Sequence, residues 1–170
     1  MTAGQRRKLQ PQCGWGYAVY RDGDPQAWEI PLHENCGRTV LDMGNPGYVG
    51  AVRLSNNTAE LQAALEAMLW LLEQTHSAHP IVNINAKIQL TFDSTYVVKL
   101  LLGETRPKHN IVLISQLLTA WSLCRDLYAM GRPQWRRAHR GDVGNERADL
   151  LSKRGGRNPD TPNDVRHPLP

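Results

Sequence analysis

The clearest hydrophobic pattern in the chain is a helical one that begins at Asn57. Apolar residues follow with a 3.6-residue period and share one face: Leu61, Ala64, Leu65, Met68 and Leu72. Glu60 stands three residues after Asn57, which is the spacing of a capping box, so we expect Asn57 to be the N-cap. The pattern predicts a long helix with one face on the core.

A second helical pattern begins near Asn110 and ends before Gly131. Its apolar positions also share one face: Ile114, Leu117, Trp121, Cys124 and Tyr128. Two shorter helices are expected, one from about residue 95 to Gly103 and one from about residue 145 to 154. Gly103 suits the left-handed conformation that often ends a helix.

Other segments have the alternating pattern of strands. Residues 15–21 and 27–32 are joined through an Asp-Gly turn, which predicts a hairpin. Residues 87–93 alternate and end at an aspartate, and residues 134–138 form a further strand. This order of elements predicts an α/β fold with a mixed sheet and helices packed on its faces.

Composition narrows the class of protein only slightly. The chain has 170 residues, 41% of them hydrophobic, which suits one globular domain. A net charge of +4 favours a polyanionic partner without demanding one. The three cysteines form no CxxC pair, and no apolar run is long enough to cross a membrane, so an intracellular protein, cytoplasmic or nuclear, is expected. Residues 156–170 contain few apolar residues and are expected to be a disordered tail.

Three acidic residues occupy positions where a site could form. Asp93 ends a predicted strand, where ligand sites in open sheets tend to lie. Glu60 and Asp149 each fall in the first turn of a predicted helix, where an acidic residue is also common for purely structural reasons. His139 precedes Asp149 by ten residues, and glycines between them predict a mobile loop.

Three motifs occur in an order that resembles a known family. "NNTAEL", "TFDSTYV" and "HRGDVGNERAD" resemble the Glu, second-Asp and His-to-last-Asp motifs of the type 1 ribonuclease H domain, and "GWGYAVY" resembles its second strand. The loop before "NNTAEL" is most similar to protist and retroelement versions. The resemblance covers residues 13–155 and implies a ribonuclease H-like fold, with an antiparallel hairpin and parallel strands in one mixed central sheet.

The resemblance implies an endonuclease that cuts the RNA strand of an RNA–DNA hybrid by two-metal-ion hydrolysis. Glu60, Asp93 and Asp149 match three metal ligands of the family, and the ions are expected to be Mg²⁺ or Mn²⁺. His139 matches a loop histidine that assists proton transfer or product release. The protein is expected to act as a monomer.

Contacts to the hybrid are implied for several polar side chains. Asn57 matches an asparagine of the family that contacts the hybrid, and Asn56 beside it is a weaker candidate. Arg136, Arg137 and Arg140 are candidates for phosphate contacts, with a solvated basic strand edge as the alternative for each. The basic helical extension of some family members has no counterpart here, which predicts weak affinity for the hybrid.

The first strand of the family, which supplies a fourth carboxylate, has no clear match. Residues 1–12 contain no acidic residue, and Ala3 stands where the aspartate belongs if Thr2 to Gly4 are aligned with the family's Thr-Asp-Gly. The segment is therefore expected to be a degenerate first strand or the remnant of a truncated one. Losing one ligand predicts weakened metal binding.

Other acids are poor substitutes for the missing carboxylate. Asp22 and Asp24 lie in the predicted hairpin turn, away from the expected site. Asp42 lies in the glycine-rich segment 33–54, which is expected to be loop with a short strand at 39–41. Two hypotheses remain: a nuclease that is impaired in this chain, or an inactive ribonuclease H-like module that only binds nucleic acid.

Overall fold

The computed structural model describes residues 13–138 and 141–157. Its elements, in chain order, are β1 (Gly14–Val19), β2 (His33–Arg38), α1 (Asn56–Gln74), β3 (Lys87–Ile88), β4 (Thr91–Phe92), α2 (Thr95–Leu101), α3 (Ile111–Leu127), β5 (Ala129–Met130), β6 (Gln134–Trp135) and α4 (Val143–Arg157). The expected degenerate first strand at 1–12 lies outside the described residues, as does the part of the expected tail from residue 158 onward.

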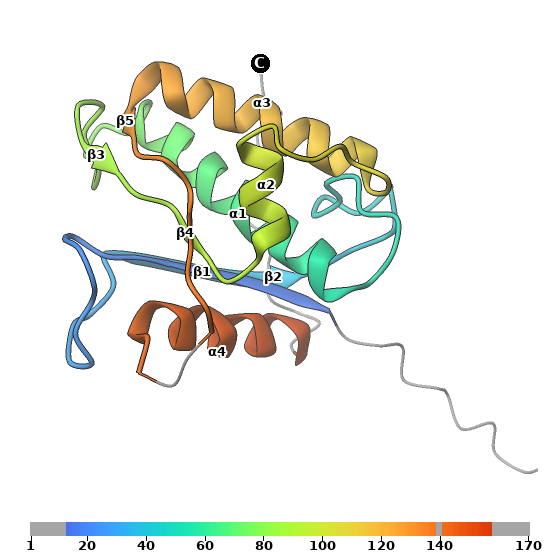
Figure 1. Ribbon diagram of the computed structural model, residues 1–170, viewed down its shortest axis with the longest axis horizontal. Helices are drawn as coiled ribbons and strands as arrows, with labels where there is room; N and C mark the ends of the chain where they lie inside the picture. Colours follow the sequence, from blue (N-terminus) through green and yellow to red (C-terminus); the bar gives the residue numbers. More distant parts are fainter. Residues whose placement is uncertain (1–12, 139–140, 158–170) are drawn as a thin grey trace, which may run out of the picture.

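Helices cover both faces of the β1–β2 pair, as the order of elements predicts. Figure 1 shows α1 and α3 on one side of these strands and α4 on the other. Trp15 and Tyr17 belong to the hydrophobic core with Leu61 and Trp70 of α1. Gly16, between these two aromatic residues, faces α4 so closely that a Cβ atom there would overlap Leu151. Alternate residues of β1 therefore present large aromatic side chains to α1 and glycine to α4.

The strands form three separate pairs. β1 and β2 are antiparallel, whereas β3 pairs in parallel with β5 and β4 in parallel with β6. The predicted strand at 87–93 is broken in its middle, where the Gln89 side-chain amide donates to the carbonyl oxygens of Leu90 and Arg132. Among the described residues, no backbone hydrogen bond joins β1 to β3 or β4.

The predicted hairpin is real, but its second strand was placed too early. Val19 pairs with His33 and Gly14 with Arg38, so residues 20–32 form a long connection. Trp28 and Ile30 in that connection are 81% and 85% exposed. Proline in this segment lacks the N–H group that a strand ladder needs, which explains why pairing starts only at His33. The short strand expected at 39–41 is also absent from the described fold.

The two long helices bury the faces that their periodicity predicts. Leu61 and Met68 of α1 and Ile114 and Leu117 of α3 are at most 1% exposed. The expected N-cap of α1 is wrong, however. Ser55, in an extended conformation, accepts a hydrogen bond from the backbone N–H of Thr58 at 3.2 Å. A serine three residues before that N–H meets the capping geometry without Asn57.

The last helix is longer than its sequence pattern indicates. It runs from Val143 to Arg157, although the expected tail begins at residue 156. Gly155 and Gly156 are buried because they let α4 approach the backbones of Gly37 and Gly14. Tertiary packing thus overrides the low helix propensity of two consecutive glycines. Among the described residues, no helix has both the length and the apolar character to span a membrane.

Candidate active site

A cleft of about 1280 Å³ lies between strand β1 and residues 86–94, and we call it the central cleft. Its side walls are β1 and residues 86–94, and its other walls are α1 and α4. Glu60, Asp93 and Asp149 all line this cleft, although they come from three different elements. The structure therefore places the three predicted carboxylates around one space.

Glu60 lies close enough to Asp93 for the charge of Asp93 to affect it. Burial is the main effect that raises the pKa of Glu60 above its ordinary value, and the negative charge of Asp93 raises it further. The Ser94 hydroxyl, hydrogen-bonded to Glu60, acts in the opposite direction. Two carboxylates in such a setting attract a cation, because it would offset their mutual repulsion.

Local structure fixes the position of Asp93. It follows β4 directly, and its carbonyl oxygen accepts a hydrogen bond from the Trp135 indole N–H at 3.0 Å. The next residue, Ser94, is buried and caps α2 through the backbone N–H of Val97. The backbone at Asp93 is therefore held by the end of β4, the start of α2 and the Trp135 indole, while the Asp93 carboxylate is exposed.

Asp149 approaches the central cleft from α4. Its side chain is exposed and forms an ion pair with Lys153 at 2.6 Å, one turn further along the helix. Surface pairs of this kind contribute about 0–1 kcal/mol, so the pair is a weak constraint on Asp149.

The donor atoms fit a hard divalent cation in kind, since carboxylate oxygens are the ligands that Mg²⁺ prefers. In the ranges 13–138 and 141–157, no three acidic, histidine or cysteine side chains gather into a group able to hold a metal ion. Glu60 and Asp93 are adjacent, and Asp149 stands apart on α4. The described site is therefore a carboxylate pair with a third acid nearby.

The predicted nucleic-acid contacts are distributed unevenly. Asn56 lines the central cleft, and Asn57 beside it is exposed on the first turn of α1. Arg137 is also exposed. His139 and Arg140, predicted as a loop acid–base residue and a phosphate contact, lie outside the described residues.

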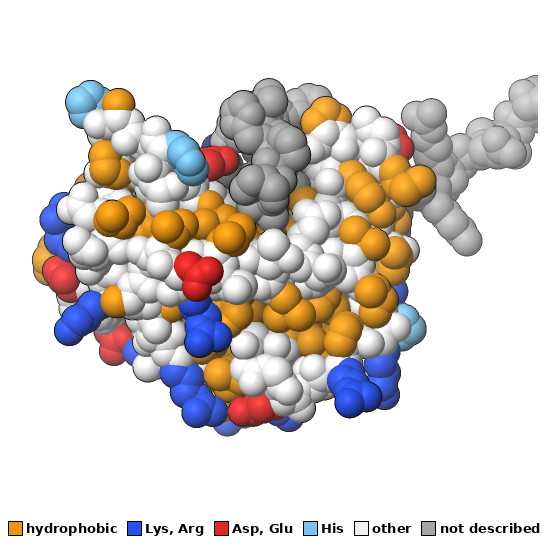
Figure 2. All heavy atoms as spheres, turned by 90° about the horizontal axis from the view of Figure 1, so that it is seen from above, with side chains coloured by type: hydrophobic (Ala, Val, Ile, Leu, Met, Phe, Trp, Pro, Cys, Tyr) orange, Lys and Arg blue, Asp and Glu red, His pale blue; other side chains and the backbone are white. Residues whose placement is uncertain are grey.

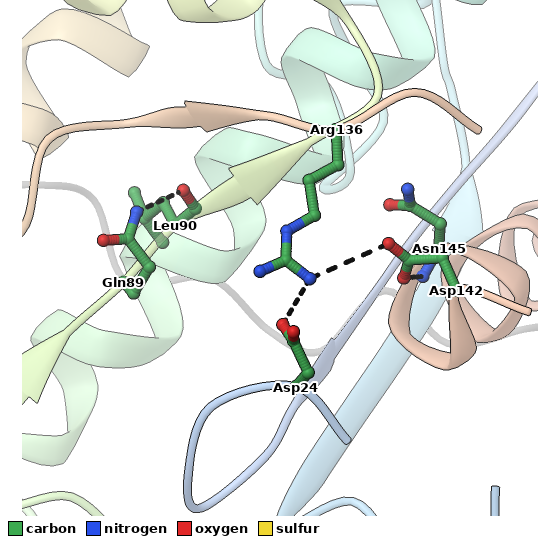
Figure 3. A network of polar contacts seen from close by, with 6 residues as sticks. All are labelled: Asp24, Gln89, Leu90, Arg136, Asp142 and Asn145. Carbon is green, nitrogen blue, oxygen red and sulfur yellow. Dashed lines mark hydrogen bonds and ion pairs between the residues drawn. The ribbon is translucent and has the colours of Figure 1, made fainter. Parts of the chain in front are cut away.

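Arg136 is already engaged in ion pairs at the mouth of the cleft. Its guanidinium contacts Asp24 in the β1–β2 connection and lies 3.9 Å from Asp142 before α4, as Figure 3 shows. Asp142 in turn accepts a hydrogen bond from the Asn145 backbone N–H at 3.0 Å. The expectation that Asp24 lies away from the site is wrong, because the long β1–β2 connection brings it to the cleft.

Sequence reasoning missed three polar residues of this cleft. Ser94 touches Glu60, Asp142 pairs with Arg136, and Asn145 has a buried side-chain nitrogen without a partner among the described residues. Ser94 and Asp142 each stand just before a helix, so an N-cap search would have found them. Figure 2 shows basic side chains along the lower edge of this face and patches of hydrophobic groups above them.

The sequence matches one family model and is similar to several known proteins. The family model described as RNase H matches residues 3–157. A ribonuclease H from Methylorubrum extorquens is 32% identical over 157 residues, which cover 82% of this chain and 59% of that protein. A ribonuclease H from Thermosynechococcus vestitus is 33% identical over 154 residues, covering 81% and 86%. The chain thus spans less than two thirds of the first of these relatives.

A solved structure supports the same fold. The N-terminal RNase H domain of a Mycobacterium tuberculosis protein, determined as a fusion with maltose-binding protein, has a TM-score of 0.50. The likeness covers 84% of this chain and 90% of that one at 16% sequence identity, so it bears on the fold alone.

Proposed function

The chain belongs to the ribonuclease H family, and from this premise we propose that it hydrolyses the RNA strand of RNA–DNA hybrids at the central cleft. The observation that carries the proposal is the pairing of Glu60 with Asp93 at the carboxyl end of a parallel strand. Proteins of this family use divalent metal ions. Glu60 and Asp93 would hold such an ion here, with Asp149 reaching it from α4.

Each residue has a defined task in the proposed reaction. Mg²⁺ or Mn²⁺ bound there would supply an activated water and charge stabilisation at the leaving oxygen of a phosphodiester. Ser94 orients Glu60 through its hydroxyl, and Trp135 holds the backbone at Asp93. Asn56 at the cleft and the exposed Arg137 suit contacts to the sugar–phosphate backbone of the hybrid. His139 is proposed to carry protons and Arg140 to contact phosphate.

The test is cleavage of an end-labelled RNA–DNA hybrid in Mg²⁺ or Mn²⁺. We expect slow cutting by the protein and none by Asp93→Asn, which removes a charge without changing shape. Asp42→Asn is the matched control, because Asp42 lies in an exposed loop and its side chain accepts a hydrogen bond from the Gly44 backbone N–H. Cutting that survives Asp93→Asn would contradict the assignment of the site.

A second candidate function is hybrid binding without catalysis. One observation favours it: the described residues gather no group of three side chains able to hold a metal ion. Here the hybrid would shift in a gel-retardation assay, and no product would exceed that of Asp93→Asn at any metal concentration.

We also propose that the protein works as a monomer in a reducing compartment, cytoplasmic or nuclear. Cys13, Cys36 and Cys124 are free and buried, and desolvation raises the pKa of the Cys124 thiol to about 12. A buried thiol of this kind is unreactive. Cysteines that are free and form no disulfide are typical of proteins in a reducing compartment. Sedimentation of the purified chain tests the monomer, and imaging of a tagged copy tests the compartment.

A further inference from the structure

We propose that the connection between β1 and β2, residues 20–32, is an autoinhibitory strap that the ion pair of Asp24 with Arg136 holds beside the candidate active site. The proposal rests on the proposed function, because the strap opposes the binding of the nucleic acid that this function requires. It is carried by the position of the ion pair, by the charge of the segment and by the ease with which the attachment can be broken.

The ion pair lies next to the predicted metal ligands. Arg136 directly follows β6, the parallel partner of β4, and Asp93 directly follows β4. On the other side of the guanidinium, Asp142 directly precedes α4, the helix that carries Asp149. Figure 3 shows the Arg136 side chain between Asp24 and Asp142. The strap is therefore attached between the ends of two elements that carry predicted metal ligands.

The charge of the strap disfavours nucleic acid. It contains Arg21 and three acidic residues, Asp22, Asp24 and Glu29, which give it a net charge of −2 in a chain whose net charge is +4. Asp24 presents its carboxylate to Arg136, as a phosphate of a bound hybrid would. In this position the strap occupies a predicted phosphate contact and also repels the phosphate backbone. A closed strap therefore opposes hybrid binding.

The attachment can be broken by the ligand that it opposes. The side chains of Arg136 and Asp24 are 39% and 67% exposed, so water and salt screen their attraction. Among the described residues, this ion pair is the polar contact that ties residues 21–31 to a distant element. A hybrid phosphate that binds Arg136 in place of Asp24 therefore frees the strap.

Packing adds little to this attachment. Trp28 and Ile30 are largely exposed, so these large apolar side chains do not anchor the strap. Pro25 touches the first turn of α4, since a Cβ atom added at Gly144 would lie 3.7 Å from the Pro25 Cγ atom. Side chains at these two positions are close enough to be joined by a disulfide, which provides a direct test.

The first experiment locks the strap with the double variant Pro25→Cys/Gly144→Cys. Its affinity for a fluorescein-labelled RNA–DNA hybrid is measured by fluorescence anisotropy without divalent metal, before and after reduction with dithiothreitol. We expect the oxidised protein to bind about tenfold more weakly than the same protein after reduction. The single variant Pro25→Cys should bind equally in both conditions, and circular dichroism melts establish that each variant folds. Equal affinity of the locked and reduced double variant would overturn the proposal.

The second experiment contains no nucleic acid, so it separates a failure of the strap from a failure of the proposed function. The exchange equilibrium between the two introduced thiols and glutathione reports their effective concentration. Adding Asp24→Asn to the double variant should lower this value about two- to fivefold, and adding Asp22→Asn should leave it unchanged. No change with Asp24→Asn would show that the ion pair does not hold the strap. A protein that gives the expected exchange but binds no hybrid when reduced would refute the proposed function, and with it the action of the strap on the hybrid.

Discussion

Arg147 of α4 donates two hydrogen bonds to the Glu34 carboxylate of β2, at 2.6 and 2.5 Å. This bidentate pair joins the last helix to the hairpin on the face away from α1. The hydrogen bond from Arg147 is the main cause that lowers the pKa of Glu34 below its ordinary value. The pair is partly exposed, so water and salt weaken it.

Arg147→Met is expected to lower the free energy of unfolding at pH 7 by about 1–2 kcal/mol. Because the folded-state pKa of Glu34 is depressed, its stabilising effect is complete above the unfolded pKa and is lost as the pH falls through the folded one. The variant should therefore lose less stability than the wild type on acidification. Urea unfolding at pH 7 and pH 3 measures both effects. Arg132→Met removes a more exposed pair and should change stability by less than about 0.5 kcal/mol.

Gly16→Ala should destabilise the protein by about 1–3 kcal/mol, because the added Cβ atom would lie 2.5 Å from the Cβ atom of Leu151. The methyl group would push α4 away from β1. Gly44→Ala is the control, since its Cβ atom would meet only the Asp42 carboxylate at 3.4 Å. Thermal melts of the two variants should differ by several degrees, and equal melting temperatures would show that α4 yields without cost.

Glu60→Gln should abolish hybrid cutting and raise the melting temperature by about 1–3 °C. The folded-state pKa of Glu60 is raised by burial, so its charged form is less favourable in the folded protein than in the unfolded chain. Glu60 therefore costs stability once the pH passes its unfolded pKa, and the cost is complete above the folded one. Calorimetry across pH 4–8 should show the gain only toward neutral pH. A variant that is less stable at pH 7 would contradict this account.

Asp24→Asn should strengthen hybrid binding about two- to fivefold, because it removes the nearer of two acidic partners from Arg136. A freed guanidinium adds one phosphate contact, so the salt dependence of binding should also become steeper by about one unit of slope. Titrations at several salt concentrations measure both quantities. Asp22→Asn removes a charge from the same loop and should leave the slope unchanged. A decrease in affinity for Asp24→Asn would show that the ion pair instead positions the loop for binding.

Hydrophobic periodicity correctly predicted which faces of α1 and α3 are buried. Met68 and Leu117 are on these faces and are fully buried. A helix that packs on a core must bury an apolar stripe, so this feature can be read from the sequence. Boundaries that depend on tertiary contact were less predictable. Nothing local marks Gly155 as helical, because its place in α4 depends on the backbone of Gly37 more than a hundred residues earlier.

The candidate site was predictable in composition and less so in arrangement. Glu60, Asp93 and Asp149 stand in special positions along the sequence, and they line one cleft in space. The ion pairs of Arg136 were not predictable, since they depend on the path of the long β1–β2 connection. The hydrophobic pattern of a sequence does not show which charged side chains of its loops will come into contact.

The contact between the β1–β2 hairpin and α4 also governs the order in which the protein can fold. Glu34 and Arg147 are 113 positions apart, so this part of the structure depends on closing a loop that contains almost every other element. During synthesis the hairpin must leave the ribosome long before its covering helix exists. The glycine-lined face of β1 is then exposed, and we expect slow folding that is completed only after the carboxyl-terminal helix emerges.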